Sequence, residues 1–183
     1  MSKLAVFLGE GFEEIEGLTV VDICRRCGLE MDMVSVTGKA AVTGSHGITV
    51  RADKLFEEVD FAAYDMLVLP GGMPGTRNLE AHGGLMEQVD AFYGQGKYVG
   101  AICAAPSILG HRGILKGRRA CCYPGFEAQL EGAQVTDNPV EISGNVVTSR
   151  GMGTAIEFAL AIAGIFCGQD RADELAEGIV YRA

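Results

Sequence analysis

The stretch KYVGAICAAPS, residues 97–107, constrains the fold more than any other part of the chain. A short apolar run predicts a buried strand that ends at Cys103, and residues 104–112 predict the helix that follows. Cys103 then stands on the turn between strand and helix, the geometry of a nucleophile elbow that is better known with serine. Ala101 and Ala105, two positions before and after it, let strand and helix pass closely enough to expose the thiol.

The position of Cys103 also predicts reactivity. The helix after it would direct free N–H groups at the sulfur and stabilise a thiolate, so we expect a pKa below the usual value of about 8.5. The alternative is a small, buried and inert cysteine. The strand–helix turn favours the reactive interpretation.

The chain alternates predicted strands with predicted helices along its 183 residues. This order indicates an α/β fold, a single domain over residues 1–183 with a largely parallel sheet covered on both faces. The 48% hydrophobic content suits a sizeable core, and the 26 glycines suit many tight turns. We expect strands at 3–8, 31–36, 66–69, just before Cys103, and at 119–122, 140–142 and 146–148; a hairpin at 41–50; a helix or turn at 53–59; and helices at 13–27, 79–92, 104–112, 126–130, 154–167 and 171–178.

Three loops follow the carboxyl ends of predicted strands, where sites form in such sheets. They are residues 9–16, residues 71–75 and the elbow. The N–H groups of Gly71 and Gly72, with that of Ala104, could form an oxyanion hole beside the cysteine. A plain turn between two prolines is the alternative.

The acidic cluster at the start of the first predicted helix divides into two parts. Glu13 and Glu14 suit a helix start, where the helix dipole favours negative charge. Glu16 lies one turn further and could point over the sheet toward Cys103. A buried carboxyl there would be protonated and could donate a hydrogen bond to sulfur.

Charge and spacing exclude several classes of function. A net charge of −9 argues against binding to nucleic acid or to an anionic membrane surface. The longest apolar run, 158–167, is shorter than the roughly 18 residues of a membrane span, and the N-terminus does not resemble a signal peptide. We therefore expect a cytoplasmic protein with reduced thiols. The Cys24–Cys27 pair stands at a helix end, which disfavours a redox or zinc role, and we expect neither a metal nor a nucleotide cofactor.

Four segments taken together resemble the ThiJ/PfpI superfamily, most closely its DJ-one/ThiJ branch. They are GFEEIE at 11–16, LPGG at 69–72, AICAAP at 101–106 and TSRGMGT at 148–154. The resemblance covers nearly the whole chain. It implies a flavodoxin-like, doubly wound, three-layer sandwich similar to class I glutamine amidotransferases, and it implies a homodimer.

The resemblance also assigns roles within the site. Cys103 takes the place of the family's reactive cysteine, Glu16 that of its protonated glutamate, and Gly71, Gly72 and Ala104 those of the backbone donors. The functions associated with the family are cofactor-free glyoxalase and deglycase activities, oxidative-stress sensing and chaperone-like activity. Intracellular protease or amidase activity and thiazole monophosphate biosynthesis are weaker alternatives.

The chain departs from the family pattern at two positions. Tyr123 precedes Pro124 where many members have histidine, and a tyrosine with a pKa near 10 is a poor base at neutral pH. The absence of this histidine argues against protease activity and against efficient glyoxalase turnover. His46 falls where close relatives carry an arginine near the dimer interface. We expect Tyr123, Pro124, Arg150 and His46 around the pocket.

Two hypotheses remain open from the sequence. In one, Cys103 attacks a reactive carbonyl, such as a 2-oxoaldehyde or its protein adduct, and Glu16 serves as acid and base. In the other, oxidation of Cys103 to sulfinate switches a redox-responsive or chaperone-like protein.

Overall fold

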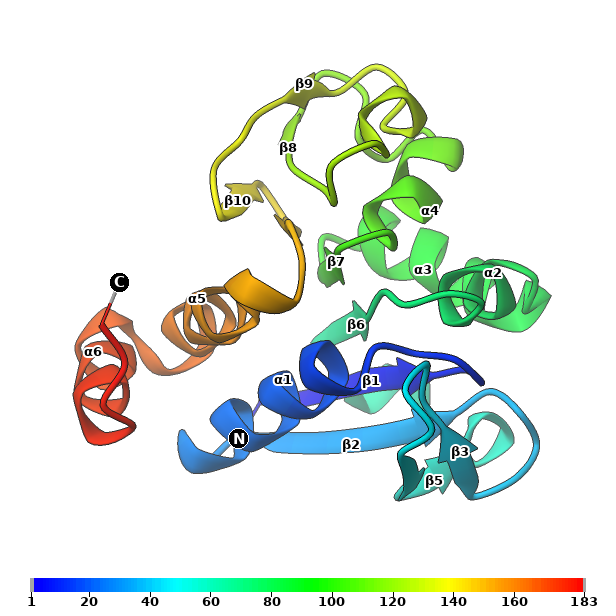
Figure 1. Ribbon diagram of the computed structural model, residues 1–183, viewed down its shortest axis with the longest axis horizontal. Coiled ribbons are helices and arrows are strands. Elements are labelled where there is room, and N and C mark those ends of the chain that lie inside the picture. Colours follow the sequence, from blue (N-terminus) through cyan, green and yellow to red (C-terminus); the bar gives the residue numbers. More distant parts are fainter. Residues whose placement is uncertain (1, 183) are drawn as a thin grey trace.

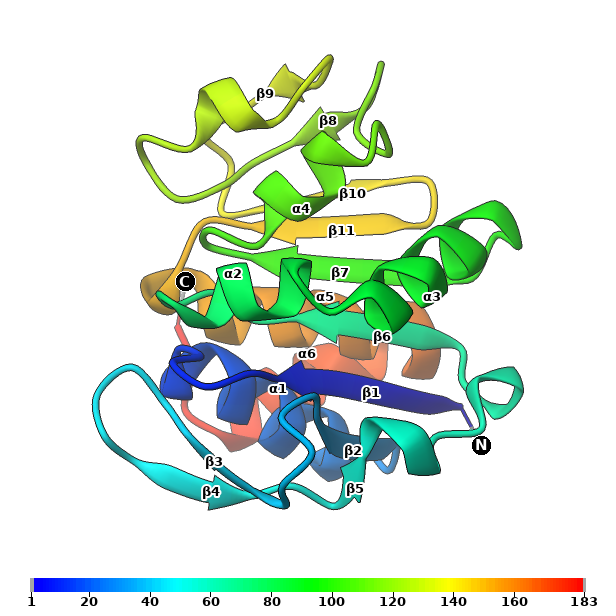
Figure 2. The same cartoon turned by 90° about the vertical axis from the view of Figure 1, so that its right-hand side faces the viewer.

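The computed structural model describes residues 2–182, and a seven-stranded sheet forms its centre (Figures 1 and 2). The strands are β1 (Lys3–Leu8), β2 (Glu30–Ser35), β5 (Lys54–Leu55), β6 (Met66–Leu69), β7 (Tyr98–Ile102), β10 (Val140–Ser143) and β11 (Val146–Ser149). They lie in the order β10-β11-β7-β6-β1-β2-β5. Neighbours pair in parallel except β10, which runs antiparallel to β11 at the sheet edge.

Helices cover both faces of this sheet (Figure 1). One face carries α1 (Glu14–Arg26), α5 (Ala155–Cys167) and α6 (Gln169–Gly178), and the other carries α2 (Gly75–Glu80), α3 (Gly83–Gly94) and α4 (Pro106–His111). Among these described residues, no helix has both the length and the apolar character that crossing a bilayer requires.

The core is divided by the sheet into two apolar clusters. Alternate side chains of β1 enter them: Phe7 packs on the α2–α4 side, whereas Leu4 and Val6 pack on the α1–α5 side. Since both faces are buried, a central parallel strand is apolar throughout, which is the run that the sequence shows at residues 3–8. The predicted three-layer α/β fold is confirmed.

The chain reverses its direction of winding between β1 and β6. It passes from β1 through α1 to β2 on one side, and later returns to place β6 on the other side of β1. The crevice at such a switch point is where open α/β sheets bind ligands. The loops after β1, β6 and β7 meet there, as the sequence predicts.

Some predicted elements differ in extent. The helix expected at 79–92 is two helices, because the chain breaks before Gly83 and His82 caps α3, its Nδ1 accepting from the N–H of Leu85 at 3.0 Å. The helix expected at 104–112 begins only at Pro106. The strand expected at 119–122 shortens to β8 (Arg119–Ala120), which pairs with β9 (Gln134–Val135) outside the main sheet.

The remaining short elements agree with expectation in part: β5 is a strand of the main sheet within the helix or turn expected at 53–59, and the helix expected at 126–130 is a single 3₁₀ turn. The hairpin consists of β3 (Ala41–Thr43) and β4 (Thr49–Arg51), paired antiparallel. A second hairpin joins β10 to β11 through Gly144, whose φ of 63° suits a tight turn. Single 3₁₀ turns cover Phe56–Glu58, Phe61–Ala63, Glu127–Gln129 and Met152–Thr154.

Candidate active site

Cys103 occupies the turn between β7 and α4 in a left-handed conformation, with φ of 66°. A non-glycine residue there carries a cost of about 1–2 kcal/mol and persists only where its surroundings hold it. Two backbone hydrogen bonds do so: Cys103 donates to the carbonyl of Ser149 at 3.0 Å, and Tyr123 donates to the carbonyl of Cys103 at 2.8 Å. The local geometry is that of the predicted elbow.

Gly71 approaches this turn so closely that no side chain fits. A Cβ at Gly71 would lie 2.6 Å from Cβ of Cys103 and 2.8 Å from Oε2 of Glu16. The N–H of Gly71 donates to that same Oε2 at 2.8 Å. Gly71 therefore holds the carboxyl of Glu16, which corrects the expectation that its N–H would be a donor beside the sulfur.

Two other backbone N–H groups, those of Ala104 and Gly72, are hydrogen-bond donors beside the sulfur, as expected. Hydrogen bonds from the N–H groups of Ala104 and Gly72 act to lower the pKa of the Cys103 thiol. Gly72 has a φ of 88°, and a Cβ there would lie 2.4 Å from the backbone nitrogen of Glu13. The loop after β6 can thus pass under the sulfur only with glycine at this position.

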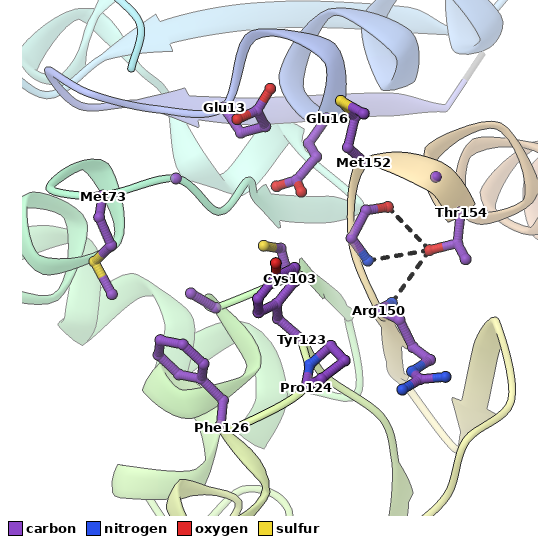
Figure 3. Close-up of a pocket in the computed structure, with 14 residues that line it drawn as sticks. Glu13, Glu16, Met73, Cys103, Tyr123, Pro124, Phe126, Arg150, Met152 and Thr154 are labelled. Carbon is purple, nitrogen blue, oxygen red and sulfur yellow. Dashed lines mark hydrogen bonds between the residues drawn. The ribbon is translucent and has the colours of Figure 1, made fainter. Parts of the chain in front are cut away.

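Glu16 projects from the first turn of α1 toward Cys103 (Figure 3). The pKa of its carboxyl is raised from 4.5 to about 7, because burial, with a smaller effect of the charge of Glu13, outweighs the lowering by hydrogen bonds with Gly71 and Cys103. A carboxyl that titrates near neutrality can serve as both proton donor and proton acceptor.

The pKa of Cys103 differs from the sequence-based expectation. Burial raises it to about 12, and the charge of Glu16 adds to the rise against the donors from Ala104 and Gly72. The expected net lowering of this pKa is wrong because burial and the charge of Glu16 outweigh the backbone donors at the start of the turn.

The thiol and the carboxyl therefore titrate as a pair. The pair loses its first proton as pH rises through about 7, and the single negative charge that results can reside on Glu16 or on the sulfur. The thiolate form requires that Glu16 holds the proton. Proton transfer within the pair is thus the step that makes Cys103 nucleophilic.

A cavity of about 610 Å³ opens above this pair (Figure 3). Tyr123, Pro124 and Arg150 line it, where the sequence placed them. Its remaining wall is largely apolar and was not foreseen, since no spacing marked Met73, Phe126 and Met152 as neighbours of Cys103.

The loop after β11 forms one side of the cavity, and the hydroxyl of Thr154 makes several of the hydrogen bonds that hold it. Oγ1 of Thr154 accepts from the N–H groups of Arg150 at 3.3 Å and Gly151 at 3.1 Å, and it donates to the carbonyl of Gly151 at 3.0 Å (Figure 3). The Arg150 guanidinium lies 3.6 Å from the carboxylate of Asp137. Figure 3 shows this guanidinium pointing away from Cys103.

His46 is not among the residues that line this cavity within one chain, and a contribution to the site of a partner stays a prediction. It stands on the β3–β4 hairpin, where its Nδ1 lies 3.0 Å from Oε2 of Glu14 and 3.5 Å from Oε2 of Glu13. Burial alone would raise the pKa of Glu14, but hydrogen bonds from the backbone and from His46 lower it to about 2.

The three side chains of Glu13, Glu14 and His46 bring potential metal ligands within 4.8 Å of one another, a cluster that the sequence pattern did not reveal. Glu14 already accepts hydrogen bonds from the backbone of His46 and Ile48 and lies within hydrogen-bond distance of the hydroxyl of Ser45. An ion-pair network accounts for this cluster.

Comparison with known proteins identifies the family. Residues 2–164 match the model of the DJ-1/PfpI family. The chain is 34% identical to DJ-1 homolog B of Arabidopsis thaliana over 98% of its own length but 42% of the plant protein, so it spans less than half of that relative. It is 34% identical to a deglycase of Pyrococcus abyssi, over 81% of this chain and 89% of the archaeal protein.

The fold agrees with this result. The structure of oxidized DJ-1 from Toxoplasma gondii superimposes with a TM-score of 0.96 and 34% identity, covering 100% of both chains. The family match spans the sheet, the elbow and the helix α1 that carries Glu16. The chain therefore belongs to the DJ-1/PfpI family.

Proposed function

We propose that this protein processes reactive carbonyl compounds with Cys103 as nucleophile and without a bound cofactor. The observation that carries the proposal is the buried pair of Cys103 and Glu16 at the base of an open cavity. The proposed substrates of the protein are 2-oxoaldehydes or their adducts on proteins. The deglycase of Pyrococcus abyssi among its relatives supports this class of substrate.

The first step forms a bond between the sulfur and the aldehyde carbon. Glu16 takes the thiol proton, Cys103 attacks, and the carbonyl π electrons move to oxygen, which then receives a proton to give a hemithioacetal. The N–H groups of Gly72 and Ala104 lie beside the sulfur and are suited to stabilise the transient oxyanion.

The second step moves hydrogen between the two substrate carbons. Removal of the proton from the former aldehyde carbon gives an enediol, and return of a proton to the adjacent carbon gives a thioester of a 2-hydroxy acid. Water then cleaves the thioester, releasing the hydroxy acid and the thiol. The aldehyde carbon is oxidised and its neighbour is reduced, so no external redox partner is needed.

Glu16 is suited to both proton transfers because its pKa of about 7 lies at the working pH. Tyr123 stands at the cavity where many family members have histidine, and its side chain is half exposed. The chain thus relies on one acid–base group, which predicts slow turnover.

The test is the conversion of methylglyoxal to lactate. The wild-type protein should form lactate in proportion to enzyme concentration, and Cys103→Ser should form none. Glu14→Gln provides a matched control, since Glu14 lies two positions from Glu16 but faces His46. Absence of lactate with a folded wild-type protein would reject the enzymatic proposal.

A second function is favoured by the oxidized state named for the Toxoplasma gondii DJ-1 structure. Peroxide oxidation of Cys103 to sulfinate would place oxygens beside Glu16, and a protonated Glu16 would donate a hydrogen bond to one of them. In this alternative the sulfinate changes a regulatory or chaperone-like activity. The test is whether the protein suppresses the aggregation of a heated client protein, measured before and after treatment with graded peroxide. A change in this activity after oxidation distinguishes the regulatory function from carbonyl turnover.

We further propose a cytoplasmic homodimer that pairs through the outer face of α1. A groove of about 500 Å³ lies there, and two apolar side chains beside it, Ile15 and Ile48, are 48% and 55% exposed. Large exposed apolar patches commonly mark protein interfaces. His46 stands beside this face, which is consistent with a place near the partner.

A further inference from the structure

A second group of thiols lies at the opposite end of α1 from Glu16. Cys27 caps the C-terminus of α1, and Cys167 is the last residue of α5. From Glu16 to Cys27 the helix rises by about 16 Å, which places this group well outside the cavity. Both helices cover the same face of the sheet (Figure 1).

The two side chains meet at these helix ends. Sγ of Cys167 donates to the carbonyl oxygen of Cys27 at 3.6 Å, and the thiol of Cys167 lies near enough to that of Cys27 to help raise its pKa. The sequence separates them by 140 positions, so only the packing of α1 on α5 brings them together.

Access distinguishes this pair from Cys24, Cys121 and Cys122, which are buried. Cys27 and Cys167 are both partly exposed, whereas Cys24, one turn earlier on α1, is fully buried. Burial and the neighbouring thiol of Cys167 raise the pKa of Cys27, and the charge of Arg171 from α6 acts in the opposite direction. A small oxidant can therefore reach the pair without opening the core.

We propose that Cys27 and Cys167 form a reversible intramolecular disulfide when the protein meets a peroxide or a low-molecular-weight disulfide. The site is independent of Cys103 and of the function proposed for it. The pair would tie the end of α1 to the end of α5.

The chemistry with hydrogen peroxide balances in two steps. One thiolate attacks a peroxide oxygen, the O–O bond breaks, and the sulfur becomes a sulfenic acid while the leaving hydroxide takes a proton to form water. The second thiolate attacks the sulfenic sulfur, forms the S–S bond and displaces the second hydroxide, which also becomes water. Both sulfurs are oxidised and both peroxide oxygens are reduced.

Cys103 should respond differently to the same oxidant. The groups that shift its pKa include a carboxyl and two backbone amides but no second thiol. A sulfenic acid on Cys103 therefore has no thiol beside it and proceeds to sulfinate. The same peroxide should therefore add oxygen atoms to Cys103 but remove two hydrogen atoms from the Cys27–Cys167 pair by forming a disulfide.

Tryptic mapping tests the proposal directly, because cleavage after Arg25, Arg26 and Arg150 separates the thiols. Cys24 falls in peptide 4–25, Cys27 in peptide 27–39 and Cys167 in peptide 151–171. The full-length protein is treated with hydrogen peroxide or with glutathione disulfide, alkylated and digested without reductant.

We expect peptide 27–39 linked to peptide 151–171, with the loss of two hydrogens per chain and full recovery of both peptides after dithiothreitol. Cys27→Ser and Cys167→Ser should each abolish the linked species, whereas Cys24→Ala should retain it. Oxidised wild-type protein should also melt at a higher temperature than reduced protein, because the cross-link restricts the unfolded chain.

Four results would overturn the proposal. They are free peptides 27–39 and 151–171 after treatment, stable glutathione adducts on them, linkage to peptide 4–25, or linkage only between chains. The wild-type map decides the question by itself if a serine variant does not fold. Loss of lactate formation has no bearing on this result.

Discussion

Replacing Glu16 by glutamine should remove a pH-dependent loss of stability. The side chain is 1% exposed, and its pKa rises from 4.5 to about 7 on folding. A pKa that is raised in the folded state means that the folded chain holds a proton that the unfolded chain has released. The stabilisation is complete below about pH 4.5 and is lost as pH rises through about 7.

The magnitude follows from the size of the shift. At about 1.4 kcal/mol per pH unit, a rise from 4.5 to about 7 corresponds to about 3 kcal/mol between the two ends of this window. The result does not depend on whether Glu16 or Cys103 carries the charge at neutral pH, because stability depends only on the number of protons bound by the pair.

Glutamine resembles the protonated acid in shape and charge. Its amide oxygen can accept from Gly71, and its NH₂ group can donate to the sulfur of Cys103. We therefore expect the free energy of unfolding of Glu16→Gln, relative to wild type, to rise by about 3 kcal/mol from about pH 4.5 to about pH 8.

Urea unfolding at fixed protein concentration measures this difference across the pH range, and the subtraction cancels the other titrating groups. Glu14→Gln is the matched control. Hydrogen bonds hold the pKa of Glu14 at about 2 against its burial, so its contribution is present above about pH 4.5 and is lost only as pH falls toward 2. Glu14 also raises the pKa of His46, so the control is made in a His46→Gln background, where the effect of Glu14→Gln should be constant between about pH 5 and about pH 8.

A constant difference for Glu16→Gln over the same window would refute the reasoning. It would mean that Glu16 is ionised in the folded protein at neutral pH. The proposed roles of Glu16 as proton donor to substrate and to a sulfinate would then both fail.

The other predictions concern the elbow, the pocket and the outer face of α1. Gly71→Ala should lower lactate formation on the order of 100-fold with little change in circular dichroism, since its Cβ would displace Cys103 or Glu16; an unchanged rate would contradict the close approach. Tyr123→His should raise the rate by roughly 10-fold through a group that titrates near neutrality, and a folded variant that is no faster would show that the base comes from elsewhere. Ile48→Glu should convert a dimer to a monomer in sedimentation, because it places a charge on the apolar face; a wild-type monomer at micromolar concentration would exclude the dimer. Graded peroxide should add two oxygens to the peptide of Cys103 before adding oxygen to Cys121 or Cys122, which are buried, and the reverse order in mass spectrometry would count against the exposed elbow.

The sequence by itself determined the fold class and the location of the site. Local patterns carry this information: an apolar run at residues 3–8 fits a strand buried on both faces, and the small residues around Cys103 fit a strand–helix turn. Because parallel strands end at one edge, the order of strands also predicted which loops meet. The extents of short elements were less certain, as the break before Gly83 shows, since a two-residue interruption leaves the helical periodicity nearly intact.

Only the tertiary structure decided the chemistry at that location. The pKa of Cys103 depends on its burial and on a carboxyl 87 positions earlier in the chain, and neither is a property of the local sequence. The N–H of Gly71 could face either the sulfur or Glu16, and the structure directs it to Glu16. His46 turns to Glu14 instead of the cavity for the same reason, since hydrogen-bond partners are chosen by distance in space.

The thiols illustrate this division most clearly. The sequence drew attention to Cys24 and Cys27 because they are three positions apart, yet the packing of α1 on α5 pairs Cys27 with Cys167 instead. Residues of one helix occupy positions determined by helical geometry, whereas contacts between helices depend on how the whole core packs.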